Sequence, residues 1–200
     1  MWLQQQWLLL IFKPLIVGSL LFYFLNATAN KTTKLKTLMI FALVFCLMGD
    51  VLLMFGHGNT LFFVLGLSAF LAGHIFYIFT FRSIIKDNHI SFHFPKTLLV
   101  VLYAAGLLYL LIPHADALVL PSILYTLVIG TMLIFALHLT RFGKVGWIIA
   151  VGAFLFVISD SFIAINKFYT PIPYNHWNVM ISYIVAQFLI VKGVTKYITK

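Results

Sequence analysis

Long apolar runs constrain this chain more than any other feature of its sequence. Seven such runs follow one another with short polar connections, at roughly 6–25, 37–55, 60–82, 97–112, 118–139, 146–166 and 178–196. A bilayer core about 30 Å thick is crossed by about 20 residues of α-helix. The runs are too long for strands and do not alternate between polar and apolar residues. They predict an all-α fold, a polytopic transmembrane helix bundle of seven spans, with residues 1–200 forming a single transmembrane domain.

Composition supports the same class. Hydrophobic residues make up 63% of the chain and charged residues 8%, whereas soluble domains have about 45–50% and about 25%. A chain with this composition would aggregate in water, so a lipid bilayer is its expected solvent. The single cysteine, Cys46, excludes an intrachain disulfide.

Basic residues predict the orientation of the spans. The first, third and fifth connections and the C-terminal tail hold most of them: Lys31, Lys34, Lys36, Arg82, Lys86, Lys96, Arg141, Lys144, Lys192, Lys196 and Lys200. The opposite side holds only Lys167. By the positive-inside rule the N-terminus is outside and the C-terminus is cytoplasmic. The net charge of +9 is thereby explained without nucleic-acid binding, and the inner membrane of a bacterium is the expected location.

Four ionisable side chains fall inside the runs: Lys13, Asp50, His74 and Asp160. Each costs about 2.5–3.5 kcal/mol to insert, so a functional role is the default hypothesis. Structural roles compete with it. Lys13 could simply neutralise one Asp in a buried ion pair, and His74 could be a hydrogen-bonded core histidine.

Depth groups several of these residues. At about 1.5 Å per residue, Asp50 and Asp160 lie about 6 Å to the outer side of their span centres. Tyr125 and Tyr183 fall in the same layer, and His74 lies about 4–5 Å to the inner side of its own centre. This arrangement favours one polar pocket that opens toward the outer leaflet.

Two carboxylates in a low dielectric cannot easily both ionise, so one holds a proton while its partner is an anion. Such a pair is equipped for general acid and general base catalysis. It also suits a cationic, oxocarbenium-like intermediate of the kind formed in glycoside hydrolysis.

At these same residues the chain resembles the YhhN family, whose members include bacterial and animal lysoplasmalogenases. The matching segments, in order, are FKPL at 12–15, LMGDVLLM at 47–54, GLSAFLAGHIFY at 66–77, GAFLFVISD at 152–160 and YIVAQFLIV at 183–191. Each segment alone is weak, but five in the expected order on the expected helices are specific. Family members usually have eight spans, with one helix before the Lys-Pro segment, which here begins almost at the start of the chain.

The resemblance implies hydrolysis of the vinyl ether bond of lysoplasmalogens to a fatty aldehyde and a glycerophospho head group, with no cofactor. The implied catalytic residues are Asp50 and Asp160. Supporting or substrate-binding roles are implied for Lys13, His74, Tyr77, Tyr125, Tyr183 and Gln187. The expected partner is a lysophospholipid within the membrane, and the oligomeric state is left open.

Three other interpretations fit parts of the pattern. A proton-coupled transporter also uses intramembrane Asp, Lys and His, but no inverted repeat is visible. A metal-dependent lipid amidase needs several deep His ligands, and only His74 lies deep in a run. A non-catalytic lipid-binding protein would bind the substrate without turnover.

Overall fold

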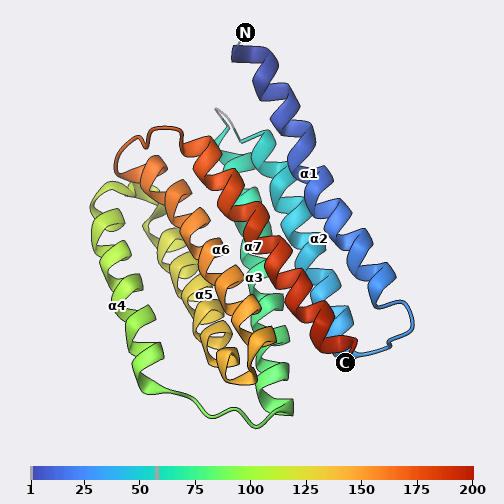
Figure 1. The fold of residues 1–200 in the computed structure, drawn as a ribbon. Coiled ribbons are helices and arrows are strands. Elements are labelled where there is room, and N and C mark those ends of the chain that lie inside the picture. Colours follow the sequence, from blue (N-terminus) through green and yellow to red (C-terminus); the bar gives the residue numbers. More distant parts are fainter. Residues whose placement is uncertain (1, 57–58) are drawn as a thin grey trace. The chain divides into compact units, whose positions relative to one another are not determined.

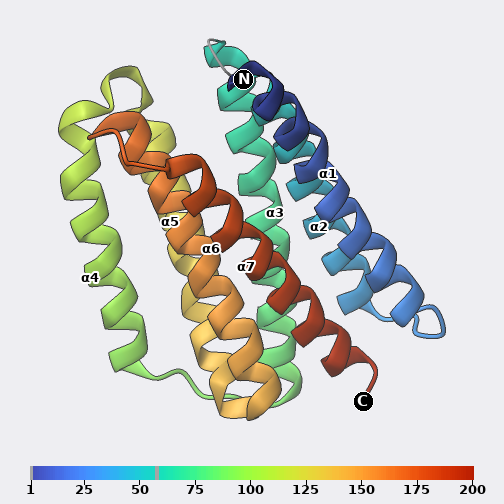
Figure 2. The same cartoon turned by 45° about the horizontal axis from the view of Figure 1, so that its top comes forward.

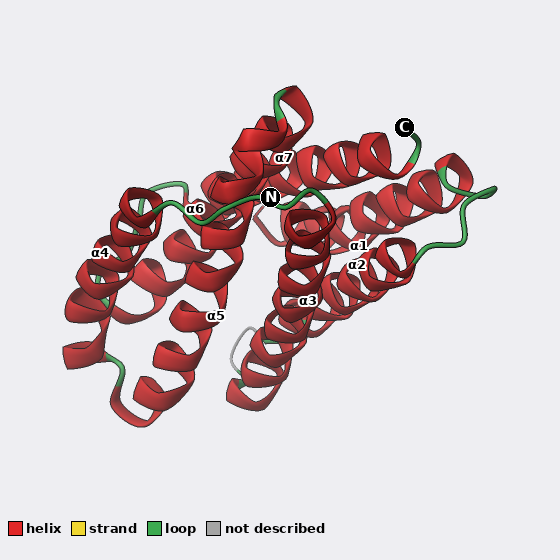
Figure 3. Ribbon diagram, turned by 90° about the horizontal axis from the view of Figure 1, so that it is seen from below, coloured by secondary structure: helices red, strands yellow, loops and turns green. Residues whose placement is uncertain are grey.

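Seven α-helices make up most of the computed structural model, which describes residues 2–56 and 59–200, with side chains described from Pro14 onward. They are α1 (Trp2–Ala27), α2 (Lys34–Met54), α3 (Thr60–Asp87), α4 (Phe94–Leu111), α5 (Val119–His138), α6 (Lys144–Phe168) and α7 (Asn175–Ile198). Short 3₁₀ turns flank α5: η1 (Ile112–His114), η2 (Asp116–Leu118) and η3 (Leu139–Phe142). These described residues contain no strand (Figure 3). Each α-helix coincides with one predicted run, which confirms the all-α prediction.

Six of the described helices are long and apolar enough to cross a bilayer. The seventh, α1, is helical throughout Trp2–Ala27, and its apolar stretch with described side chains is Pro14–Ala27. Large apolar side chains cover the outside of these helices; Leu99 and Leu120, for example, are each 66% exposed. Because hydrocarbon is the natural solvent for such a surface, the chain is an integral membrane protein. The orientation of the spans stays a prediction.

The chain forms two compact units. Unit 1 contains the described residues up to Thr80 together with Ile198–Lys200, and unit 2 contains Phe81–Tyr197. Unit 1 therefore holds α1, α2 and most of α3, while unit 2 holds the end of α3 and α4 to α7. The prediction of a single domain over residues 1–200 stays a prediction.

Glycines bring α2 and α3 close together in unit 1. A Cβ at Gly66 would lie 2.7 Å from the Leu53 side chain, and one at Gly73 would lie 2.9 Å from Cys46 Sγ. Small residues at helix contacts allow backbones to approach closely in membranes, where packing rather than the hydrophobic effect holds helices together. The other face of α2 carries α1, which runs along it (Figure 2).

In unit 2, α5 packs between α4 and α6 (Figure 1). Gly152 of α6 allows α7 to approach, since a Cβ there would lie 3.0 Å from the Ala186 carbonyl oxygen. The chain enters α6 through Gly143, whose φ of 73° is a conformation that glycine adopts without strain. These contacts hold α4 to α7 in fixed register within the unit.

Candidate active site

Asp50 lies about one turn before the end of α2 at Met54 and is buried, with 3% of its surface exposed. The preceding residue, Gly49, marks a close approach to α3, because a Cβ there would lie 2.6 Å from the Phe70 ring. Asp50 is therefore held next to a close contact between α2 and α3. A carboxyl group inside a membrane span is costly to insert, which favours a functional role for Asp50.

His74 and Tyr77 lie on α3 and are both fully buried. Residues three apart share one face of a helix, so the two side chains project from the same side of α3. Gly73, next to His74, contacts Cys46 of α2, which lies four residues before Asp50. Since α2 and α3 run antiparallel, His74 lies about one helical turn, about 6 Å, from the level of Asp50. Unit 1 thus collects three of the predicted site residues on one helix pair.

Lys13 belongs to the helical stretch of α1, immediately before Pro14. Its side chain lies outside the described residues, so its predicted role is unchanged by the structure.

Asp160 of α6 is hydrogen-bonded to Tyr125 of α5. The Tyr125 hydroxyl donates to Asp160 Oδ2 at 2.7 Å, and the pair is partly buried. Hydrogen bonds to carboxylates are short and about twice as strong as bonds between neutral groups. The structure therefore brings together two residues that the depth estimate put in one layer, and the phenol fixes the orientation of the carboxylate.

Tyr183 and Gln187 of α7 are also brought together. Gln187 Nε2 donates to the Tyr183 hydroxyl at 3.3 Å, and both residues are buried. The Tyr183 ring meets Phe156 edge-on, with centroids 5.3 Å apart. Phe156 precedes Asp160 by one turn of α6, so the phenol of Tyr183 packs beside the face that carries Asp160.

Hydroxyl groups on both sides of Asp160 were missed by the sequence interpretation. The Ser161 hydroxyl donates to the Val157 carbonyl at 2.7 Å and lies 2.6 Å from the Tyr103 hydroxyl. Since Ser161 has one proton to donate, Tyr103 is the donor of that second bond. Ser159 donates to the Val179 carbonyl of α7 at 3.1 Å. The Ser-Asp-Ser run at 159–161 was the available signal, because three consecutive polar residues inside an apolar span point toward three different neighbours.

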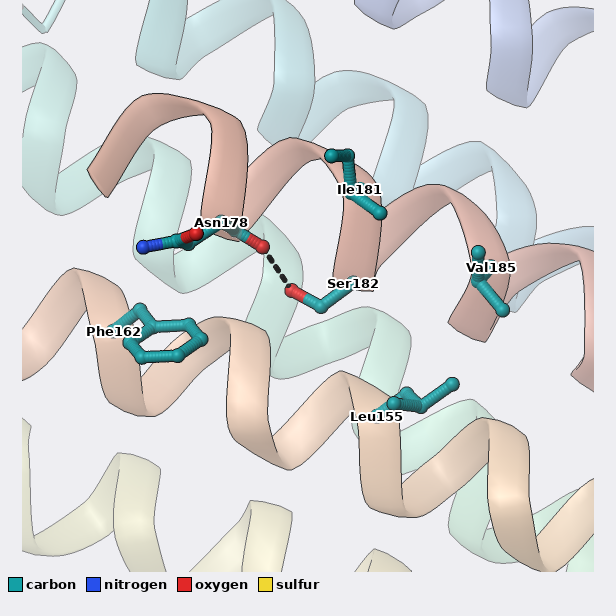
Figure 4. Close-up of a pocket in the computed structure, with 6 residues that line it drawn as sticks. All are labelled: Leu155, Phe162, Asn178, Ile181, Ser182 and Val185. Atoms are coloured by element: carbon teal, nitrogen blue, oxygen red, sulfur yellow. Dashed lines mark hydrogen bonds between the residues drawn. The ribbon is translucent and has the colours of Figure 1, made fainter. Parts of the chain in front are cut away.

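A groove between α6 and α7 lies on a different side of α6 from Asp160. It has a volume of about 300 Å³ and is lined by Leu155, Phe162, Asn178, Ile181, Ser182 and Val185 (Figure 4). Leu155 and Phe162 are seven residues apart and share one face of α6, whereas Asp160 is turned about 140° from Leu155 at 3.6 residues per turn. The groove and Asp160 therefore lie on different sides of α6.

The predicted site residues thus form two sets. Asp50, His74 and Tyr77 belong to unit 1, while Asp160, Tyr125, Tyr183 and Gln187 belong to unit 2. Within residues 14–56 and 59–200, no group of three His, Cys, Asp or Glu side chains is arranged to hold a metal ion. The pairing of Asp50 with Asp160 stays a prediction.

Comparison with known proteins places the chain in a family. The model of the YhhN family matches residues 8–194, which include both carboxylates and all the other predicted site residues. The chain belongs to the YhhN family. The resemblance inferred from the five sequence segments is confirmed.

Named relatives of this YhhN chain are lysoplasmalogenases. It is 32% identical to lysoplasmalogenase TMEM86B of Sus scrofa over 197 residues, which are 96% of this chain and 78% of the relative. It is 34% identical to TMEM86B of Homo sapiens over 64% of this chain and 52% of the relative. It is 33% identical to human lysoplasmalogenase TMEM86A over 74% of this chain and 61% of the relative. The match thus spans about half to four-fifths of these longer proteins, and no solved structure matches the chain.

Proposed function

We propose that this YhhN-family chain is a lysoplasmalogenase, a hydrolase that cleaves the vinyl ether bond of lysoplasmalogens within the membrane. The observation that carries the proposal is the similarity to TMEM86B, which extends over 96% of the chain. The substrate class is a single-chain alkenyl glycerophospholipid with an ethanolamine or choline head group. The bacterial inner membrane is part of the same proposal.

The proposed chemistry uses the two intramembrane carboxyl groups, Asp50 and Asp160. One carboxylic acid protonates the alkenyl carbon that is not bonded to oxygen, which gives an oxocarbenium ion. The other, as a carboxylate, stabilises that cation and takes a proton from the water that adds to it. The resulting hemiacetal loses the glycerol oxygen as an alcohol and leaves a fatty aldehyde. One water is consumed, and no metal or redox step is needed.

Local contacts support this assignment of Asp160. The bond from Tyr125 to Asp160 Oδ2 at 2.7 Å holds the carboxylate in one orientation, as a group that must meet the substrate or water in a fixed geometry requires. In unit 1, Asp50 is buried beside α3, where bulk water does not reach the carboxyl group.

The other polar residues have supporting roles in the proposal. His74, Tyr77, Tyr183 and Gln187 orient the water and the glycerol hydroxyl. Lys13 tunes the carboxyl groups or meets the phosphate of the head group.

The test measures aldehyde release by the purified chain in lipid nanodiscs. Lysoplasmalogen should yield aldehyde, while the matched alkyl ether lipid without the double bond should not. Asp50→Asn and Asp160→Asn should each lower the rate about 10²- to 10⁴-fold, the usual contribution of general acid–base catalysis. Asp116→Asn, at an exposed position at the start of η2, is the matched control and should keep full activity.

Protonation at carbon gives an independent readout. In D₂O the aldehyde, trapped at once by reduction, should carry one deuterium on the carbon next to the former carbonyl. Full activity in either Asp50→Asn or Asp160→Asn would remove the acid–base assignment. Tight lipid binding without any aldehyde from the unaltered chain would instead identify a lipid-binding relative.

A further inference from the structure

Two basic side chains converge at one end of unit 2. Lys96, in the first turn of α4, donates from Nζ to Thr140 Oγ1 at 2.6 Å and to the Leu137 carbonyl at 3.0 Å. Arg141, the residue after Thr140 in η3, donates from Nη1 to Ser91 Oγ at 2.9 Å. Because Lys96 bonds to Thr140, the residue before Arg141, the two cations lie next to each other.

These two positive charges are not neutralised by the part of the chain that the structure describes. Every protein partner of Lys96 and Arg141 there is a carbonyl or hydroxyl oxygen, and none is a carboxylate. An ammonium has three N–H donors, and Lys96 uses two of them. A guanidinium has five, and Arg141 uses one of them. Two adjacent like charges with free donors are unfavourable alone and favour an anion between them.

A rigid frame holds the cations in place. His138, at the end of α5, accepts a hydrogen bond on Nε2 from the His93 backbone N–H at 2.7 Å. Its Nδ1 therefore carries the proton and donates to the Ile134 carbonyl at 2.7 Å. Phe92 packs on the His138 ring with centroids 4.4 Å apart. The segment before α4 is thus fixed to α5, and the positions of Ser91 and Lys96 are fixed with it.

Exposed aromatic residues next to the cations indicate which kind of anion fits. Phe92 and Phe94 are 56% and 75% exposed. Phe94 is the first residue of a membrane-spanning helix, so both rings lie near one end of that span. Apolar rings beside a pair of cations match the boundary between head groups and acyl chains. A free inorganic anion would use the charges but gain nothing from the rings.

We propose that Lys96 and Arg141 bind the phosphate of an anionic phospholipid, whose acyl chains lie against Phe92 and Phe94. This site is separate from the proposed catalytic residues and does not depend on the proposed function. By the positive-inside prediction it lies at the cytoplasmic leaflet, where anionic lipids also concentrate.

The test compares lipids that differ only in charge. Detergent-purified full-length chain is titrated with short-chain phosphatidylglycerol, with phosphatidylcholine of the same chain length, and with inorganic phosphate, while binding is followed by native mass spectrometry and thermal unfolding. Phosphatidylglycerol should bind more tightly and raise Tm more than phosphatidylcholine. A cation that pairs with the lipid phosphate contributes about fivefold to the affinity, so Lys96→Gln and Arg141→Gln should each lose about fivefold and the double variant about 25-fold.

Lys144→Gln is the matched control, since Lys144 is an exposed cation three residues after Arg141; it should lose less than twofold, as expected of a charge outside the site. For each variant, the result is the difference in affinity and in Tm between phosphatidylglycerol and phosphatidylcholine, so a general loss of stability cancels. Arg141 is exposed, so Arg141→Gln should still fold. Equal binding of the two lipids, or equal losses in Lys144→Gln and Arg141→Gln, would overturn the proposal. Phosphate that competes as strongly as phosphatidylglycerol would also overturn it, in favour of a free-anion site.

Discussion

Tyr125→Phe isolates one hydrogen bond of the candidate site. The substitution removes the phenolic hydroxyl that donates to Asp160 at 2.7 Å and keeps the aromatic ring. No buried cavity results, since only one oxygen atom is lost. The effect on activity therefore reports how much the proposed catalytic role of Asp160 depends on the hydrogen bond from α5.

The size of the effect follows from the charge on the acceptor. A hydrogen bond to a charged group contributes about 1.5–3 kcal/mol, compared with about 0.5–1.5 kcal/mol between neutral groups. If that energy is realised only when Asp160 is correctly placed for reaction, kcat should fall about 10- to 150-fold. KM should change little, because the phenol acts on Asp160 and not on the lipid.

Tyr103→Phe is a closely matched control. It also removes a phenolic hydroxyl bonded to α6, at 2.6 Å from Ser161, but its partner is neutral and is not assigned a catalytic role. The assay is aldehyde release in nanodiscs, with Tm measured on the same samples. We expect a similar or smaller change of Tm in Tyr103→Phe and a loss of activity below about tenfold, the limit set by a neutral hydrogen bond.

Two results would refute this reasoning. Wild-type kcat in Tyr125→Phe would mean that the bond to Asp160 is not used in catalysis. Equal losses in Tyr125→Phe and Tyr103→Phe would mean that both act only through the packing of α6. A double-mutant cycle with Asp160→Asn adds a further check. Once the carboxylate is gone, Tyr125→Phe should have no additional effect on kcat.

Two further predictions concern packing. Gly73→Ala places a Cβ 2.9 Å from Cys46 Sγ and 3.2 Å from a carbonyl of α2, so thermal unfolding should show that the free energy of unfolding falls by about 1–3 kcal/mol. Gly106→Ala is the control, since a Cβ there meets nothing within 4 Å and should cause no loss of stability. Equal losses in the two variants would contradict the close contact at Gly73. Leu155→Trp fills the groove on the side of α6 away from Asp160, so aldehyde release should stay within about twofold, whereas a loss above tenfold would put the groove in the path of the substrate.

The positions of the helices could be predicted because a bilayer imposes length and apolarity together. Each predicted run corresponds to one helix, although α3 continues to Asp87, past the predicted end at 82. That extension holds Ser83, Lys86 and Asp87 together with the buried Ile84 and Ile85, so polar residues interrupt the hydropathy signal while helical hydrogen bonding continues. Apolarity therefore marks the part of a helix that crosses the membrane and not the whole helix.

The candidate site could be predicted only where a residue is expensive to bury. Asp160 was identified because a carboxylate in a span requires a reason, and Tyr125 because it shares the same depth. Tyr103 was missed because a phenol is common in this chain and inexpensive at a membrane interface. Its bond to Ser161 depends on the rotation of α4 about its own axis, which neither hydropathy nor depth determines.

Asp50 also bears on how the protein enters the membrane. On insertion scales one Asp at a helix centre opposes partitioning by about 2.5–3.5 kcal/mol, while each Leu, Ile, Phe or Val favours it by about 0.3–0.6 kcal/mol. Roughly four to twelve such residues offset the acid, and about half of α2 consists of Leu, Ile, Phe and Val. Asp50 also lies within one turn of the helix end, where the penalty is smaller. The apolar residues of α2 therefore offset much of the cost of carrying Asp50 into the membrane.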